Sequence, residues 1–154
     1  MSLPLLPTRD ELLSALQIVR AQLPPTPTIR WPLLEQRLGA PVFVKHENHT
    51  ALGAFKLRGG VVYVHELLWR EPGVRGLICA TRGNHGQSIA RAAARQGLRA
   101  TIVVPHGNSA EKNAAMRALG AVLIEHGDDF QQAREHAAAL AGERGLHLVP
   151  SFHR

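Results

Sequence analysis

Apolar residues near the N-terminus recur with the period of one helix face, at intervals of four, three and four: Leu12, Leu16, Val19 and Leu23. Thr8 and Glu11 precede this run at the spacing of a capping box, in which a hydroxyl and a carboxylate satisfy the first backbone groups of a helix. Pro24 and Pro25 follow the run, and prolines end a helix. The pattern therefore predicts an amphipathic helix near the start of the chain.

The next segment predicts short elements and then one long helix. Residues 26–30 are expected to be extended, because residues before proline avoid helical backbone angles. A short helix over 33–38 should close at Gly39, and residues 41–45 are predicted as a strand. From 54 to 70 the length of the pattern favours a helix, although that segment contains four successive strand-forming residues.

The second half of the chain alternates between apolar runs and helical patterns. The apolar runs are predicted strands over residues 76–80, 100–104, 121–124 and 146–149. Three helices are expected between them: one over 84–96 followed by Gly97 in the left-handed conformation, one capped by Asn108 and ending at Gly120, and one capped by Asp128 and closed by Gly142 or Gly145. Strands that are apolar throughout are buried on both faces. We therefore expect an α/β fold with a small, open, parallel sheet of about four strands flanked by helices.

Composition narrows the classes of function. The 154 residues are about the length of one domain, and a hydrophobic content of 45% is typical of a globular core. The formal charge of +6 comes mostly from arginines spread singly along the chain, which suits a solvated surface or an anionic small ligand better than a nucleic-acid partner. Cys79 lies in an apolar run and is expected to be a buried thiol. No apolar run long enough to span a membrane and no secretion signal occur, so we expect a cytoplasmic protein.

One lysine stands in a context that favours reactivity. The chain has three lysines against fifteen arginines, and only lysine can lose its proton to become an amine nucleophile. Lys56 is expected in the first turn of the helix over 54–70, after a polar connection that contains Gly53. Phe55 and Leu57 flank it with apolar surface, and desolvation disfavours the ammonium form. A lysine that only lays its stem along apolar surface would give the same local pattern.

A second motif covers residues 81–87, between the end of a predicted strand and the start of a predicted helix. Ligands of open α/β sheets bind at that edge, and a helix start offers unpaired N–H groups to an anion. The motif lacks the glycine spacing of a dinucleotide-binding loop. His46 and His49 are three residues apart in a strand-to-loop region, and no carboxylate or cysteine completes a metal set, so we expect structural or surface roles for both and no metal.

The two motifs together resemble those of the fold-type II pyridoxal-phosphate (PLP) enzymes, most closely the threonine dehydratase/serine racemase group. The first signature of that group is Lys-x-Glu, a short spacer and Ser/Ala-Phe-Lys-x-Arg-Gly, and the second is Ser-Ser/Ala/Thr-Gly-Asn-His-x-Gln. The residues that match the first signature are Lys45, Glu47, Ala54, Phe55, Lys56, Arg58 and Gly59. The second signature corresponds to residues 81–87, with Arg82 in place of the usual small residue.

The resemblance implies a site. Lys56 would carry PLP as a Schiff base, Asn84 would hydrogen-bond the phenolic oxygen of the cofactor, and the backbone from Thr81 to His85 would hold the substrate carboxylate. The implied cofactor-binding residues are Phe55, Lys56 and Asn84, and the implied substrate-binding residues are Thr81, Arg82, Gly83, Asn84 and His85. His85 is also a candidate acid or base, although a loop histidine more often supports the backbone.

The resemblance also implies the architecture. It predicts a tryptophan synthase beta-like PLP fold, with residues 1–50 as an arm of a larger domain and residues 51–154 as the small α/β domain. Family members are about twice as long, and their glycine-rich phosphate-binding loop lies in the second half, which this sequence does not contain. We therefore expect the isolated chain to be inactive or nearly so, and the full-length protein to be a homo-oligomer, most simply a dimer.

The implied function is a serine/threonine dehydratase that converts a hydroxy amino acid to a 2-oxo acid and ammonia. A hydroxyaspartate dehydratase is an alternative, in which Arg82 meets the second carboxylate. An amino-acid racemase is a further alternative, but an arginine stays charged and is a poor proton donor at the place where racemases use a serine. From another class, the chain could act only as a binding module.

Overall fold

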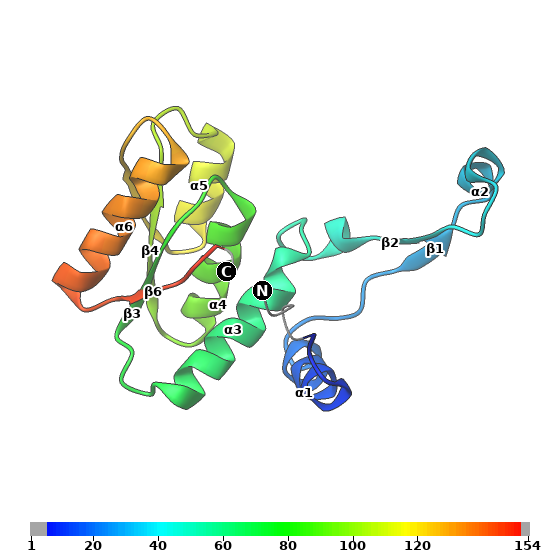
Figure 1. The fold of residues 1–154 in the computed structure, drawn as a ribbon, viewed down its shortest axis with the longest axis horizontal. Coiled ribbons are helices and arrows are strands. Elements are labelled where there is room, and N and C mark those ends of the chain that lie inside the picture. The colour runs from blue at the N-terminus through cyan, green and yellow to red at the C-terminus, as the bar shows by residue number, and fades with distance from the viewer. Residues whose placement is uncertain (1–5, 152–154) are drawn as a thin grey trace.

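The computed structural model describes residues 6–151 (Figure 1). Its body is a four-stranded parallel sheet in the order β5-β4-β3-β6. The strands are β3 (Gly76–Ala80), β4 (Arg99–Val104), β5 (Val122–Glu125) and β6 (His147–Leu148). The predicted fold class is confirmed, with each strand within two residues of its predicted bounds.

Helices cover both faces of this sheet, which is why its central strands β3 and β4 are buried along nearly their whole length, whereas the edge strands β5 and β6 are partly exposed. One core contains Leu77 and Cys79 of β3 together with side chains of α3 (Lys56–Arg70), α4 (Asn84–Arg95) and α5 (Ala110–Ala118). The other core contains Ile78 and Ala80 together with side chains of α6 (Phe130–Arg144). Successive residues of β3 thus enter opposite cores, and all five are buried. Burial raises the pKa of the Cys79 thiol to about 12, so this thiol is protonated and unreactive at neutral pH.

The helix that begins at Lys56 confirms the helical prediction for this segment. Its strand-forming residues do not prevent a helix, because two of them, Val61 and Val64, are buried at helical spacing with Leu57 and Leu67. Burial of a valine or leucine side chain is worth about 1.5–3 kcal/mol, more than the few tenths of a kcal/mol by which β-branching lowers helix propensity. Side-chain burial therefore makes this segment a helix rather than a strand.

The N-terminal helix is capped as predicted. In α1 (Arg9–Arg20) the Thr8 hydroxyl accepts a hydrogen bond from the Glu11 amide at 3.3 Å, and the Glu11 carboxylate accepts one from the Thr8 amide at 2.6 Å. Val19 and Leu23 pack on α3 through Leu57 and Val61. The helix is thereby fixed along the helix that begins at Lys56.

A hairpin projects from the body (Figure 1). It consists of β1 (Thr28–Arg30), α2 (Pro32–Leu38) and β2 (Phe43–Lys45), with the two strands antiparallel and Gly39 closing α2 at φ 67°. The large apolar side chains that it exposes are Ile29, Trp31, Leu33, Leu34, Leu38 and Phe43. An apolar surface of this kind on a projecting hairpin indicates an interface.

Two predicted helix caps were wrong by one residue. The cap of α5 is Ser109, whose hydroxyl accepts from the Lys112 amide at 3.3 Å. Asn108 instead donates to Oδ1 of the buried Asn113 at 2.6 Å, so its side chain is engaged by a tertiary partner that sequence spacing does not show.

The cap of α6 is Asp129, whose carboxylate accepts from the Gln132 amide at 2.8 Å. The side chain of Asp128 is 91% exposed and lies 3.7 Å from His106. Of the two glycines proposed to close α6, Gly145 does so, at φ 61°. No helix among residues 6–151 is long and apolar enough to cross a membrane.

Candidate active site

Lys56 is the first residue of α3, as predicted. The turn before it is held by Thr50, whose hydroxyl donates to the Ala54 carbonyl at 2.9 Å and accepts from the Ala54 amide at 3.0 Å. Lys56 is half-buried, and its Nζ lies 5.9 Å from the centroid of the Phe55 ring. Phe55 itself is 63% exposed, so the lysine and the aromatic ring together face an open side of the body.

Close packing of α3 against α4 brings the two sequence motifs together. A side chain at Gly60 would overlap the Ser88 hydroxyl, so only glycine permits this approach of the helices. Ser88 then donates its hydroxyl hydrogen to the Lys56 carbonyl at 2.8 Å. The start of α3 is therefore joined directly to the second turn of α4.

The loop between β3 and α4 is shaped from within by Thr81. This residue is buried, and its Oγ1 accepts from the amides of Gly83 at 3.0 Å and Gly86 at 3.4 Å. A Cβ at Gly86 would lie 2.5 Å from the Thr81 methyl carbon and 2.7 Å from the Met116 sulfur. The Thr81 hydroxyl is thus used to form the turn, and the Thr81 amide donates to the Val103 carbonyl at 3.0 Å, so this amide is not free to bind a substrate carboxylate.

The start of α4 has two backbone donors that the protein does not use. Gly86 donates to Thr81, and Gln87 donates to the Gly83 carbonyl at 3.1 Å. Within residues 6–151 no acceptor faces the amides of Asn84 and His85. Free amides at a helix start are suited to a carboxylate. The Asn84 side chain is exposed beside them, and so is that of Arg82.

His85 is close enough to Lys56 for the lysine charge to affect its titration. Burial lowers the pKa of His85, and the charge of Lys56 lowers it further. Its Nε2 is buried and has no hydrogen-bond partner in the described part of the chain. A buried nitrogen without a partner costs roughly 1–3 kcal/mol, so it is a position where a ligand group would be stabilised. The structure thus brings together Lys56, Asn84 and His85, which the sequence places in separate motifs.

Glu47 and Arg58, both in the first motif, form an ion pair beside the start of α3 that holds this part of the chain in place. Arg58 donates Nε to Oε2 of Glu47 at 2.7 Å and Nη2 to Oε1 at 2.9 Å, and Thr26 donates to Oε1 at 2.6 Å. The hydrogen bond from Arg58, followed by that from Thr26, lowers the pKa of Glu47 to about 2. Lys45 is 3.9 Å from the same carboxylate and donates to the Thr26 carbonyl at 2.6 Å.

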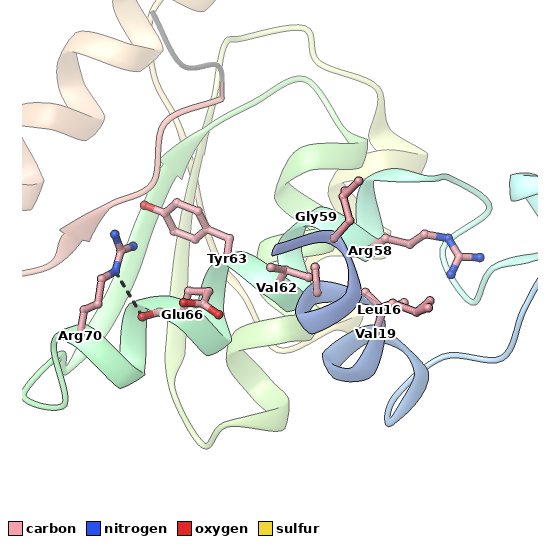
Figure 2. Close-up of a pocket in the computed structure, with 10 residues that line it drawn as sticks. Leu16, Val19, Arg58, Gly59, Val62, Tyr63, Glu66 and Arg70 are labelled. Atoms are coloured by element: carbon pink, nitrogen blue, oxygen red, sulfur yellow. Dashed lines mark hydrogen bonds between the residues drawn. The ribbon is translucent and has the colours of Figure 1, made fainter. Parts of the chain in front are cut away.

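A groove of 650 Å³ runs between α1 and α3 but is separate from this site (Figure 2). Figure 2 shows Leu16 and Val19 of α1 on one side and Gly59 and Val62 of α3 on the other. Its lining includes Arg58 but neither Lys56 nor any residue of the loop before α4. The candidate site is therefore an open surface at the starts of α3 and α4 and not this groove.

The two histidines of the first motif lie in an aromatic cluster. Trp31 donates its Nε1 hydrogen to His46 Nε2 at 3.3 Å, and the rings of His46 and His49 are 5.7 Å apart. In residues 6–151 no three His, Cys, Asp or Glu side chains are grouped so that they could hold a metal ion. The absence of a metal at the candidate site stays a prediction.

Comparison with known proteins gives the family. The chain belongs to the family of pyridoxal-phosphate dependent enzymes, which matches residues 19–154. It is 34% identical over 148 residues to the L-threo-3-hydroxyaspartate ammonia-lyase of Saccharomyces cerevisiae, covering 96% of this chain and 45% of that enzyme. It is 37% identical over 119 residues to the biosynthetic L-threonine dehydratase of Pasteurella multocida, covering 77% of this chain and 23% of that enzyme.

A solved structure agrees in fold. A pyridoxal 5'-phosphate-dependent aspartate racemase superposes with a TM-score of 0.88 at 28% identity, over 96% of this chain and 46% of the racemase. The chain thus spans less than half the length of these relatives. The names of these relatives agree with the PLP-dependent family and with the resemblance of this chain to threonine dehydratases. The three named activities, a dehydratase, an ammonia-lyase and a racemase, differ from one another.

The residues present fit the aldehyde end of PLP. Lys56 is half-buried and forms no ion pair with any residue from 6 to 151, so its amine is available. The unpartnered His85 nitrogen and the free amides of α4 provide polar groups on the same side. Sequence patterns did not reveal the contact between Gly60 and Ser88, the support from Glu47, or the position of Lys112 over Gly83. A lysine in the first turn of α5, where an acidic residue is preferred, is the one available signal for Lys112.

Proposed function

We propose that this chain carries the Schiff-base lysine of a PLP-dependent dehydratase that converts a hydroxy amino acid to a 2-oxo acid and ammonia. The observation that supports this most directly is the position of Lys56 beside His85 and the free amides of α4, in a chain of the PLP family. L-threonine is the substrate named for the dehydratase of Pasteurella multocida, and L-serine, which has the same β-hydroxyl and one methyl group fewer, is proposed beside it. Because the chain spans less than half of its relatives, the proposal concerns a site completed by the rest of the family fold.

Lys56 has two roles in this proposal. Its Nζ would hold the cofactor covalently. Once the substrate amine had displaced it, the free amine of Lys56 would remove the proton from the substrate α-carbon. When bound, PLP supplies an electron sink for the charge that develops at that carbon. Loss of the β-hydroxyl as water, followed by hydrolysis, yields the 2-oxo acid and ammonia.

The loop before α4 would orient the reactants. The amides of Asn84 and His85 would bind the α-carboxylate, and the Asn84 side chain would donate to the phenolic oxygen of the cofactor. His85 has a lowered pKa, so it would be neutral near Lys56 and would not compete for an anion. Phe55 would lie along the cofactor as an apolar wall.

Arg82 supports a second substrate. It is exposed, forms no ion pair with the rest of residues 6–151, and comes directly before Gly83 of the loop. A guanidinium there suits the second carboxylate of hydroxyaspartate, the substrate named for the yeast relative. The same residue does not support racemisation, because it stays charged and cannot move a proton to the second face.

The proposal includes an assembly. We propose that residues 1–50 belong to an arm of a larger domain, that residues 51–154 form the smaller domain, and that the complete protein is a homo-oligomer. The apolar side chains of the projecting hairpin support the first point, since a stable protein covers such a surface. A chain that served only as a binding module would show the same hairpin but would not need an available amine at Lys56.

The function is tested by loading the chain with PLP and adding candidate substrates. A Schiff base on Lys56 gives a visible absorption band, and a substrate amine that displaces Lys56 changes that band and lowers the amount of cofactor that borohydride fixes to the lysine. We expect L-serine, L-threonine or L-threo-3-hydroxyaspartate to do this, with little turnover by the chain alone. L-alanine, which lacks the β-hydroxyl, should displace Lys56 without any 2-oxo acid. Absence of a cofactor band even with PLP in large excess, which offsets weak binding without the phosphate-binding loop, would contradict the enzyme and favour the binding module.

A further inference from the structure

Lys112 lies over the loop that forms the candidate carboxylate site. Its stem occupies the space that a side chain at Gly83 would need: a Cβ there would be 2.6 Å from Cδ and 3.3 Å from Cε of Lys112. The ammonium nitrogen would be 3.4 Å from the same point. The exposed Lys112 side chain thus lies over Gly83, although it comes from a different helix.

The position is unfavourable for a lysine unless something negative binds beside it. Lys112 is in the first turn of α5, where the helix dipole disfavours a cation. Within the described chain it forms no ion pair, and the carboxylate of Glu125 on the adjacent strand is taken by Arg117 at 3.5 Å. A cation placed against a loop with free amides makes that loop a site for more than one negative group.

We propose that Lys112 is a specificity-determining residue that binds a second, side-chain carboxylate of the substrate. This inference rests on the proposed function and narrows it to an acidic hydroxy amino acid. The amides of Asn84 and His85 would take the α-carboxylate, and Gly83, which directly precedes them, is the residue that the Lys112 ammonium covers. The two carboxylates of one small molecule would thus meet adjacent parts of the same turn.

The role of Lys112 differs from that of Arg82. The side chains of Arg82 and Lys112 are both exposed, but the Arg82 guanidinium is attached to the loop itself, whereas the Lys112 stem reaches Gly83 from α5. The stem of Lys112 is packed on Gly83, so less side-chain freedom is lost when its ammonium binds a ligand. Lys112 is therefore the better placed of the two cations for a defined contact.

The test uses L-malate and L-lactate, which share a hydroxyl and one carboxylate and differ in the second carboxylate. Both are titrated into the nitrogen-15-labelled 154-residue chain without cofactor, and the amide signals of Gly83, Asn84 and His85 are followed. We expect malate to bind about tenfold more tightly than lactate, the factor that one charge-assisted hydrogen bond provides. Lys112→Gln should remove this preference, and Lys112→Arg, which keeps the charge, should retain most of it.

Arg95→Gln is the matched control, because it removes the same charge from the opposite end of α4. It should leave the preference for malate unchanged. The proposal is overturned if Lys112→Gln binds malate as tightly as the wild type, if malate and lactate bind equally, or if malate does not shift these three amides. None of these measurements involves PLP, so a preference for malate without any Lys56 adduct would refute the proposed function and leave the role of Lys112 standing.

Discussion

Arg58 donates two hydrogen bonds to the carboxylate of Glu47, from Nε to Oε2 at 2.7 Å and from Nη2 to Oε1 at 2.9 Å. Glu47 follows the projecting hairpin, and Arg58 is two residues beyond Lys56 in the first turn of α3. Two parallel hydrogen bonds between a guanidinium and a carboxylate fix both distance and orientation. The Arg58–Glu47 pair thus fixes the first turn of α3, which carries Lys56, relative to the segment that follows the hairpin.

The first prediction concerns the acid stability of this pair. The pKa of Glu47 in the folded chain is about 2, below its ordinary value of 4.5, because Arg58 and then Thr26 donate to it. The stabilisation that the carboxylate contributes is therefore complete above pH 4.5 and is lost as the pH falls toward 2. Glu47→Gln should lower the free energy of unfolding at pH 7 by about 2 kcal/mol and weaken its dependence on pH in this window.

Chemical denaturation at a series of pH values measures this effect. Glu135→Gln is the control, since Glu135 is exposed in the middle of α6, away from either helix end, and it should stay within about 0.5 kcal/mol of the wild type throughout. If Glu47→Gln and the wild type lose stability in parallel between pH 5 and pH 2, the ion pair does not stabilise the fold.

The second prediction concerns two neighbouring glycines of α3. Gly60→Ala would place a methyl group on the Ser88 hydroxyl and push α3 away from α4, which should cost about 1–3 kcal/mol. Gly59→Ala meets nothing within 4 Å and should be neutral or stabilising by up to about 1 kcal/mol, because alanine favours a helix. Equal stabilities of the two variants in urea denaturation would contradict the close packing of these helices.

Sequence patterns were sufficient for the parts of the fold that depend on local periodicity. The cap by Thr8, the left-handed Gly97 at φ 70° and the four parallel strands follow from residue types and their spacing. The helix from Lys56 was predicted against its strand-forming residues, and tertiary burial explains why that prediction was right.

The omitted contacts involve partners distant in sequence, whereas the two wrong helix caps were decided by hydrogen bonds within five residues. Asn108 is not a cap, because its amide binds Asn113. The contacts of Gly60 with Ser88 and of Gly83 with Lys112 join residues 28 and 29 positions apart, and no short-range pattern reports them. The predicted site residues are brought to one edge of the body, whereas their individual roles toward cofactor and substrate stay predictions.

The third prediction tests whether the two motifs meet in solution. Burial and then the charge of Lys56 lower the pKa of His85, so removing that charge should raise this pKa part of the way toward its ordinary value of 6.5. Lys56→Met should show the rise in a titration of the His85 ring by NMR. Arg99→Gln, at the start of β4, removes a charge elsewhere and should leave the ring unaffected. An unchanged His85 pKa in Lys56→Met would show that the two motifs do not lie close together in solution.

The fourth prediction concerns Arg82. Since Lys112 is the cation proposed to bind the second carboxylate and the Arg82 side chain is exposed, Arg82→Ala should change the affinity for malate by about 0.5 kcal/mol or less, as surface substitutions do. The comparison is made in the same amide titration as for Lys112. A loss of roughly 2–4 kcal/mol for malate, with lactate unaffected, would assign the second carboxylate to Arg82 instead.

The most direct test of the central claim is to trap the cofactor and locate it. The chain is incubated with PLP, reduced with borohydride and digested, and the modified peptide is identified by mass. We predict one principal adduct, on Lys56, and its loss in Lys56→Ala, because Lys45 donates to the Thr26 carbonyl and lies beside Glu47, and because Lys56 is the lysine that follows Phe55 in the first motif. An adduct on Lys45 or Lys112, or one that persists undiminished in Lys56→Ala, would contradict the assignment of Lys56 as the Schiff-base lysine.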